Sequence, residues 1–230
     1  MSAAEAVADI KDGATVMISG FGGSGAPIEL IHALIDQGAK GLTVINNNAG
    51  TGQIGLAALI REGRVAKVIC SYPRTTDARC FTELYLAGKI ELELVPQGTL
   101  AERMRAAGAG MPAYYTRTGA GTQIAEGKET RVVEGETCVL EKWLKADVAL
   151  VKADLADEVG NLTYRLSARN FGPVMCMAAA KTIVQAREIR PKGGIDPEVI
   201  VTPGIYVDRL VAIPEPAQEE VLFRAGARYP

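Results

Sequence analysis

Short apolar runs alternate along this chain with segments whose apolar residues recur every three or four positions. Ala14 to Ser19, Leu42 to Ile45 and Ala66 to Cys70 are short and contain β-branched residues, which is typical of buried strands. The segments that follow Pro27 and run from Ile54 to Ile60 have the helical period instead. Strands that alternate with helices predict an α/β fold with a mostly parallel sheet and flanking helices.

The same alternation continues to the end of the chain, apart from a turn-rich segment at residues 108 to 127 that has no period. No repeat or linker divides the sequence, so we expect one domain over residues 1–230, with the tail after Pro214 on the surface. Further helices are expected over Ala3–Lys11, Ala78–Ala87, Thr99–Ala107 and Ala168–Ala180; strands over Ile90–Val95, Ala146–Ala153, Thr182–Ala186, Val199–Thr202 and Asp208–Ile213; and a hairpin over Thr130–Leu140.

Composition narrows the class of protein. A hydrophobic share of 48% and a charged share of 23% are those of an ordinary globular protein. The net charge of −2 and the absence of a basic run argue against nucleic acid and anionic membranes as partners. No segment has the length of a membrane span or the form of a signal peptide. The four cysteines lack metal or redox spacing, which predicts buried thiols in a reducing cytoplasm.

A glycine-rich loop, Gly20 to Gly25, lies between the first strand and the helix that begins near Pro27. Its backbone N–H groups could approach a ligand closely, and the helix N-terminus that follows favours an anion such as phosphate. The loop also fits the dinucleotide pattern G-x-G-x-x-G. That pattern needs an acidic residue after the next strand, where Asn46 to Asn48 stand instead, so NAD and FAD are disfavoured. A tight turn without a ligand stays open as an alternative.

The sequence contains no complete catalytic set. Its only histidine, His32, falls inside a helix and is expected to be packed, and no cluster has metal-ligand spacing. Gln97 follows a strand, where its carboxamide could donate to a developing oxyanion, or could cap the helix at Thr99. Ligands of open α/β sheets bind beyond the carboxyl ends of strands, and the uncharged polar residues found there are Asn46, Asn47, Asn48, Ser71 and Gln97.

At this point the chain resembles a known family. DGATVMISGFGGSGAP is similar to the first signature of the family I coenzyme A transferases, in their small or A subunit. INNNAG, ELELVPQGTLAERMRAAGAG, GNLTYRLSARNFGP and VTPGIYVDRLV also match that subunit, so the resemblance extends from about Asp12 to Ile213. One departure is Ser19, where the family usually has a second glycine before Gly20 and Phe21.

The resemblance implies the α/β coenzyme A transferase fold, coenzyme A esters as substrates and no permanently bound cofactor or metal. The resemblance gives Gln97 the role of the glutamine that stabilises the oxyanion of the reaction. It implies a glutamate nucleophile in a Ser-Glu-Asn-Gly motif of a B subunit; this chain lacks that motif, so a B partner is required, in an A2B2 or larger assembly. The residues expected to contact coenzyme A are Ser19, Gly20, Phe21, Gly22, Gly23, Ser24, Gly25, Asn47 and Asn48.

The motifs INNNAG-x-x-x-IGLAAL and ELYLAGKIELELVPQG look closest to the family members that move coenzyme A from succinyl-CoA to 3-oxoadipate in aromatic catabolism. Transfer from succinyl-CoA to acetoacetate is the alternative within the family. Outside it, sugar-phosphate isomerases and sensor domains of related fold remain alternatives. Ser71 and Arg74 are candidate substrate residues, with Arg74 expected to pair with the second carboxylate of a dicarboxylate or, alternatively, to be a solvated surface arginine.

Overall fold

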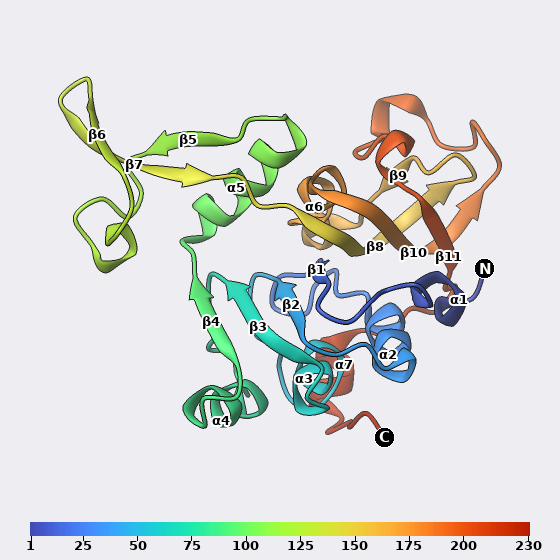
Figure 1. Ribbon diagram of the computed structural model, residues 1–230. Helices are drawn as coiled ribbons and strands as arrows, with labels where there is room; N and C mark the ends of the chain where they lie inside the picture. The colour runs from blue at the N-terminus through green and yellow to red at the C-terminus, as the bar shows by residue number, and fades with distance from the viewer.

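The computed structural model describes residues 1–230, and an eight-stranded sheet forms its centre (Figure 1). The strand order is β11-β10-β8-β1-β2-β3-β4, and every pair along this path is parallel. The short β9 pairs antiparallel with β8. These pairings confirm the predicted mostly parallel α/β sheet. Its strands are β1 (Thr15–Ile18), β2 (Leu42–Ile45), β3 (Val65–Cys70), β4 (Glu91–Leu94), β8 (Ala146–Asp157), β9 (Leu162–Thr163), β10 (Ala179–Arg190) and β11 (Arg209–Ala212).

Helices cover both faces of this sheet, which explains why its central strands are apolar throughout. In β1, Val16 and Ile18 belong to one buried cluster while Met17 belongs to the other. The first cluster packs under α1 (Ala3–Val7), α2 (Ile28–Gln37), α3 (Gly55–Arg61) and α4 (Arg79–Leu86). The second packs under α5 (Gln97–Gly108) and α6 (Gly172–Ala178).

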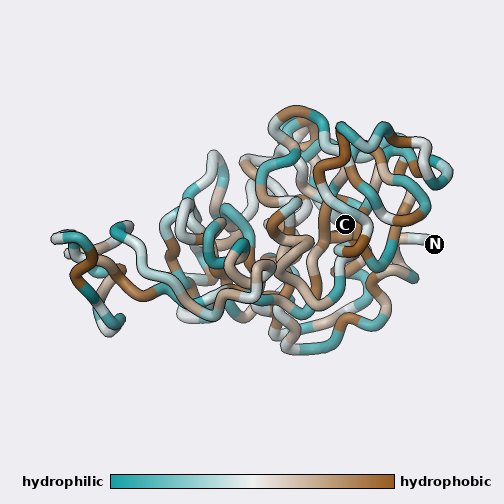
Figure 2. The backbone as a smooth tube through the Cα atoms, turned by 90° about the horizontal axis from the view of Figure 1, so that it is seen from above, coloured by the Kyte–Doolittle hydropathy of each residue, from teal (hydrophilic) through white to brown (hydrophobic).

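A second, three-stranded antiparallel sheet forms an arm that projects from the body (Figures 1 and 2). It consists of β5 (Ala113–Thr116), β6 (Thr130–Val133) and β7 (Glu136–Lys142), with a short 3-10 helix at Gln123–Ala125. The β6–β7 hairpin confirms the sequence prediction. Its turn residues Glu134 and Gly135 both have positive φ, the backbone that a two-residue hairpin turn requires. Strand β5 lies in the segment for which no element was predicted.

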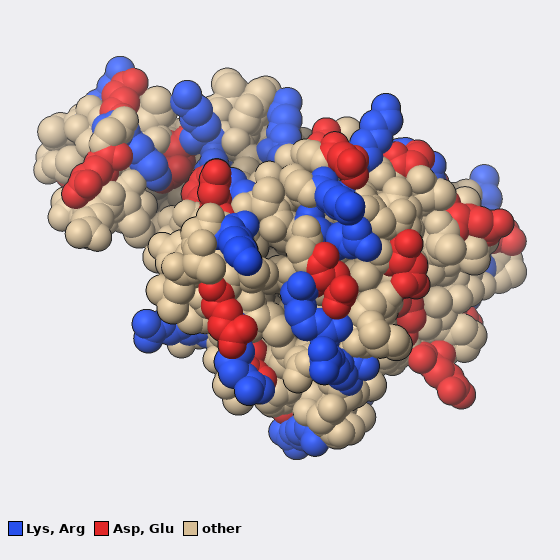
Figure 3. All heavy atoms as spheres, turned by 60° about the horizontal axis from the view of Figure 1, so that its bottom comes forward, with Lys and Arg blue, Asp and Glu red and all other residues tan.

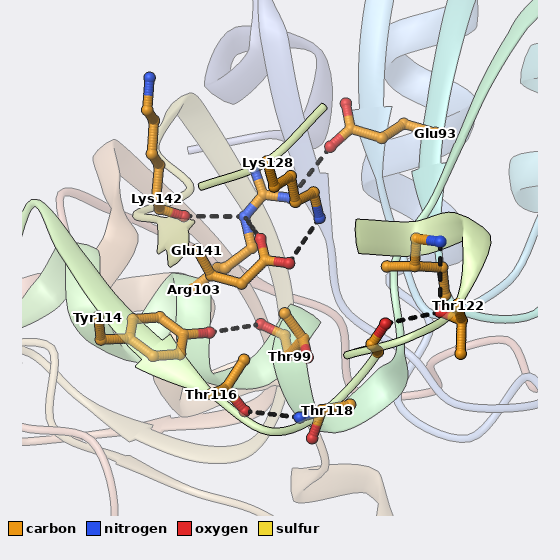
Figure 4. Close-up of polar contacts among 12 residues, drawn as sticks. Glu93, Thr99, Arg103, Tyr114, Thr116, Thr118, Thr122, Lys128, Glu141 and Lys142 are labelled. Atoms are coloured by element: carbon orange, nitrogen blue, oxygen red, sulfur yellow. Dashed lines mark hydrogen bonds and ion pairs between the residues drawn. The ribbon is translucent and has the colours of Figure 1, made fainter. Parts of the chain in front are cut away.

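Ion pairs at the base of the arm fasten it to α5 and β4 (Figure 4). Glu141 is only 3% exposed and accepts a 2.6 Å bond from Lys128 Nζ. Arg103 of α5 donates to the Lys142 carbonyl at 2.9 Å and to Glu93 of β4 at 3.0 Å. Arg103 also lies 3.9 Å from the Glu141 carboxylate, and a buried carboxylate that loses a partner is costly, so Arg103 holds α5 against the arm. Gln97, the first residue of α5, is thereby fixed relative to the sheet.

Two sequence predictions in the last third of the chain are wrong. The segment Val199–Thr202 is not a strand, because only Thr202 bridges to Leu162 and a 3-10 helix occupies Pro197–Val199. The predicted helix Ala168–Ala180 divides into a 3-10 turn at Leu166–Arg169 and α6, and β10 already begins at Ala179. A further 3-10 turn covers Gly204–Tyr206. The tail after Pro214 lies on the surface as expected, apart from Glu219, the buried first residue of its helix α7 (Glu219–Arg224).

Charge on the face drawn in Figure 3 is mixed, with acidic and basic side chains interleaved over the helices below the sheet. That face carries no extended field of one sign, the feature that attracts nucleic acid. The cysteines are all unpaired; Cys70, Cys138 and Cys176 are buried, whereas Cys80 is half-buried, against the expectation for it. No helix has both the length and the apolar character needed to cross a membrane.

Candidate active site at the carboxyl edge of the sheet

A cavity of about 590 Å³ lies beyond the carboxyl ends of β1, β2, β3 and β4. Because these four strands are parallel neighbours, the loops that follow them converge on one edge of the sheet. Helix α7 forms the opposite wall. The lining residues are Phe21, Gly22, Asn47, Asn48, Thr51, Tyr72, Arg74, Thr75, Thr76, Gln97, Glu219, Glu220 and Phe223.

The three asparagines after β2 are buried, and their side chains shape the loop. The Asn46 amide donates to the Ile18 carbonyl at 2.7 Å, and its oxygen accepts from the Asn48 backbone N–H at 2.8 Å. The Asn48 side chain repeats this turn by accepting from Gly50 at 2.7 Å. Asn side chains commonly bond the backbone two residues on, which makes the chain turn sharply at such positions. Asn47 is left pointing into the cavity.

Asn47 joins the ends of three strands. Its Oδ1 accepts from Ser71 Oγ after β3 and from Gln97 Nε2 after β4, both at 2.8 Å. The structure therefore brings together the predicted residues Asn47, Ser71 and Gln97. The carboxamides of Asn47 and Gln97 retain N–H groups that no protein atom accepts, and both side chains line the cavity. The alternative role of Gln97 as a helix cap is wrong, since α5 has no side-chain cap and Gln97 bonds Asn47 instead.

The glycine loop satisfies many of its own polar groups. Phe21 and Ser24 exchange two backbone hydrogen bonds, of 3.0 and 3.1 Å, across a turn at Gly22 and Gly23. The Gly20 N–H donates to Asn170 at 3.3 Å. The backbone N–H groups of Gly22 and Gly23 have no protein partner. Of the seven residues from Ser19 to Gly25 that were predicted to contact coenzyme A, only Phe21 and Gly22 line the cavity.

Ser19 is 1% exposed and lies behind the loop, where its Oγ donates to the Gly25 carbonyl at 2.7 Å. Ser24 and Gly25 border a separate cavity of about 400 Å³. The amino end of α2 faces neither space, because its Leu30 N–H donates to Gln185 inside the protein at 3.2 Å. Protein groups thus occupy the helix terminus that the sequence offered as an anion site.

Two glycines of the loop, Gly22 and Gly25, differ in how much room a side chain would have. A Cβ at Gly25 would lie 2.5 Å from the Ala168 carbonyl oxygen, whereas a Cβ at Gly22 would meet nothing within 4 Å. Both residues have positive φ, which costs an L-residue about 1–2 kcal/mol. We expect Gly22→Ala to lower the free energy of unfolding by about that amount, and Gly25→Ala by about 2–5 kcal/mol. Urea titration of both variants tests this, and equal losses would contradict the difference in room between the two positions.

Arg74 lines the cavity from the loop after β3. Its guanidinium is exposed and forms no ion pair or hydrogen bond with the protein. An unpaired cation beside the Gln97 and Asn47 amides is available to a negatively charged ligand.

Glu219 is the site residue that the sequence did not reveal. It begins α7, is 7% exposed and lines the cavity, and no protein group bonds its carboxyl. Burial raises the pKa of Glu219 to about 7, with the neighbouring Glu220 adding to the rise and Lys152 opposing it. The signal in the sequence was slight: two adjacent glutamates before an apolar helix turn in a tail expected to be exposed.

The only histidine is structural, as expected. His32 Nε2 accepts from the Gly55 backbone N–H at 3.1 Å, and its ring packs 4.6 Å from that of Tyr229. Burial lowers the pKa of His32, so it is neutral at physiological pH. No group of three or more His, Cys, Asp or Glu side chains is arranged to hold a metal ion.

Comparison with known proteins gives a consistent result. The family model described as "Coenzyme A transferase" matches residues 1–212. The chain is 58% identical over 212 residues to the A subunit of the 3-oxoadipate CoA-transferase of Pseudomonas putida, covering 92% of each chain. It is 51% identical over 219 residues to the A subunit of the succinyl-CoA:3-ketoacid coenzyme A transferase of Xanthomonas campestris, covering 94% of this chain and 90% of that one.

Among solved structures, an acyl-CoA transferase from E. coli O157:H7, determined as a thioester complex with CoA, aligns with a TM-score of 0.83 and 25% identity. The alignment covers 95% of this chain and 50% of that chain. The present chain is thus similar to half of that longer polypeptide.

Proposed function

Because the chain belongs to the coenzyme A transferase family, we propose that it is the A subunit of an enzyme that moves coenzyme A from succinyl-CoA to 3-oxoadipate. The observation that carries the proposal is its similarity, over nine-tenths of its length, to the A subunit of a 3-oxoadipate CoA-transferase. A second relative with the same name, from Acinetobacter baylyi, is 56% identical. The relatives named for 3-ketoacids are somewhat less similar, which favours 3-oxoadipate over acetoacetate.

The chemistry divides one transfer into easier covalent steps. A glutamate carboxylate from the B partner attacks the thioester carbon of succinyl-CoA; the thiolate of coenzyme A leaves and a succinyl-glutamyl anhydride forms. The thiolate then attacks the glutamyl carbonyl, releasing succinate and leaving a glutamyl-CoA thioester. The carboxylate of 3-oxoadipate attacks that thioester, which expels the thiolate and forms a 3-oxoadipyl-glutamyl anhydride. The thiolate then attacks the 3-oxoadipyl carbonyl, which forms 3-oxoadipyl-CoA and releases the glutamate carboxylate.

Each attack places negative charge on a carbonyl oxygen, and this chain supplies donors for it. Gln97 has an N–H beyond the one that Asn47 accepts, and both carboxamides lie at the same end of the cavity floor. Donors that are fixed before the reaction stabilise the oxyanion without reorganising. Asn47 and Ser71 act as positioning residues for Gln97. The predicted coenzyme A contacts that border the same space are Phe21, Gly22, Asn47 and Asn48.

A B partner completes the site. The relatives are named as A subunits, and the acyl-CoA transferase of known structure has about twice the length of the matching part. Both facts support a second chain that supplies the other half of the site and its nucleophile. An A2B2 or larger assembly is the arrangement we propose, with coenzyme A esters as substrates rather than permanently bound cofactors.

The preference for 3-oxoadipate over acetoacetate tests the proposal, and we expect Arg74 to control this preference. We expect the complex of both subunits to use 3-oxoadipate in preference to acetoacetate. A guanidinium that pairs with the second carboxylate contributes a charged hydrogen bond, so Arg74→Ala should raise KM for 3-oxoadipate roughly 10- to 100-fold. Acetoacetate has no second carboxylate, and its KM should change little. Steady-state assays of both acids give the comparison.

Arg79 provides a matched control, because it is an exposed arginine of the same region that pairs with Asp77 and lies outside the cavity. Arg79→Ala should leave both KM values unchanged. If Arg74→Ala raised KM equally for both acids, Arg74 would be a surface arginine without a role in acid preference. A complex that prefers acetoacetate would overturn the assignment of 3-oxoadipate.

A further inference from the structure

The segment after residue 213 is a fixed wall of the cavity. At its start, the Ala217 backbone N–H donates to Glu29 at 2.6 Å, and the Ala217 carbonyl accepts from Lys152 Nζ at 2.9 Å. At its end, the Tyr229 carbonyl accepts from Arg61 at 2.9 Å. These contacts hold both ends of the segment against the body, so α7 keeps its position beside the glycine loop. The family match ends at residue 212, before this wall begins.

Two glycines make room for the carboxyl of Glu219. A Cβ at Gly23 would lie 2.7 Å from Glu219 Oε2, and a Cβ at Gly55 would lie 3.3 Å from Oε1. Gly23 follows β1 and Gly55 begins α3, so separate parts of the chain form this notch. The carboxyl inside it has no hydrogen-bond partner in the protein. A buried polar group without a protein partner favours a partner in the space beside it, and Glu219 lines the cavity.

Burial raises the pKa of Glu219, and the charged groups around the notch modify this effect. Its neighbour Glu220 repels the ionised form, although Glu220 itself pairs with Arg224 at 2.7 Å. Lys152 attracts it, but the Lys152 ammonium already donates to Ala217. Glu29 is engaged by the Ala217 N–H and by Gln185. A protonated carboxyl is a hydrogen-bond donor, whereas the ionised form can only accept.

We propose that Glu219 is a specificity-determining residue whose carboxyl donates a hydrogen bond to the non-reacting carboxylate of the acid substrate. Gln97 and Asn47 serve the reacting end at the strand termini, whereas Arg74 and Glu219 stand on the loop and tail that border the rest of the cavity. Hydrogen bonds from an O–H group to a carboxylate are short and strong. The inference rests on the proposed function, since it concerns the same acid in the same cavity.

The test compares Glu219→Ala and Glu219→Gln in the complex of both subunits, with KM and kcat measured for 3-oxoadipate and acetoacetate between pH 6 and 8.5. Glu219→Ala should raise KM for 3-oxoadipate roughly 10- to 100-fold, with kcat and the acetoacetate KM little changed. In the unmodified enzyme, the ratio of the 3-oxoadipate KM to the acetoacetate KM should rise as the pH passes about 7, because ionised Glu219 repels the substrate carboxylate. Glu219→Gln keeps a hydrogen-bond donor but cannot ionise. In this variant the ratio of the 3-oxoadipate KM to the acetoacetate KM should therefore stay low across the pH range.

Glu215→Gln is the matched control, an exposed glutamate of the same segment that should leave the pH profile as it is. A Glu219→Gln enzyme with the original pH profile, or equal losses on both acids for Glu219→Ala, would overturn the inference and leave the transferase function standing. An unmodified complex without activity on any acid would instead overturn the proposed function, and the inference with it.

Discussion

The purified chain is expected to transfer no coenzyme A by itself and to become active when its B subunit is added. The reaction needs an ionised carboxylate that can reach the thioester. Two carboxyls of this chain border the cavity. Glu219, with its pKa raised to about 7 by burial, is about half protonated at neutral pH and largely protonated below it, and Glu220 is exposed and paired with Arg224. Assays of the chain, of its B partner and of their mixture on succinyl-CoA and 3-oxoadipate measure the effect.

Chemical trapping identifies the nucleophile independently of rate. Borohydride added to the mixture during turnover reduces a glutamyl-CoA thioester to an alcohol, which peptide mass spectrometry locates. The modification should fall on the B subunit. Modification of Glu219 or Glu220, or transfer by the chain alone, would show that the nucleophile lies here and that the assignment to a partner is mistaken.

Much of this site follows from the sequence, because parallel strands bring their carboxyl ends to one edge. The apolar runs that became β2, β3 and β4 placed Asn47, Ser71 and Gln97 at three successive strand ends. Strand alternation with helices was enough to predict their convergence. The hydrogen bonds through Asn47 Oδ1 then explain why uncharged polar residues stand at all three positions.

The contribution of the tail could not be predicted in this way. The sequence before Glu219 is polar, and the apolar run that follows, Val221 to Phe223, is too short to indicate a buried element. Its burial depends on Gly23 and Gly55, whose missing side chains leave the notch, and on contacts with Glu29. Such packing between distant segments leaves no local period. The glycine loop differs from prediction for a related reason, since the Phe21–Ser24 hydrogen bonds and Asn170 take up N–H groups that seemed available to a ligand.

Gln97→Ala is expected to lower kcat roughly 100- to 1,000-fold, the usual effect of removing one oxyanion donor. The fold should tolerate this change, because Gln97 does not cap α5 and the helix is held by the Arg103 contacts with Glu93 and the Lys142 carbonyl. Assembly with the B partner and KM for 3-oxoadipate should therefore stay close to those of the unmodified enzyme. Single-turnover and steady-state measurements on the assembled complex separate these quantities.

The variant Gln97→Glu sharpens the test, because it keeps the size of the side chain while replacing the donor by an acceptor. Its carboxylate would also face Asn47 Oδ1, which now accepts from Gln97 at 2.8 Å. An oxyanion role requires Gln97→Glu to lose at least as much kcat as Gln97→Ala. The control is Gln123→Ala, at an exposed glutamine of the arm, which should keep full activity. If Gln97→Glu retained activity while Gln97→Ala lost it, space filling rather than hydrogen-bond donation would be the contribution of Gln97.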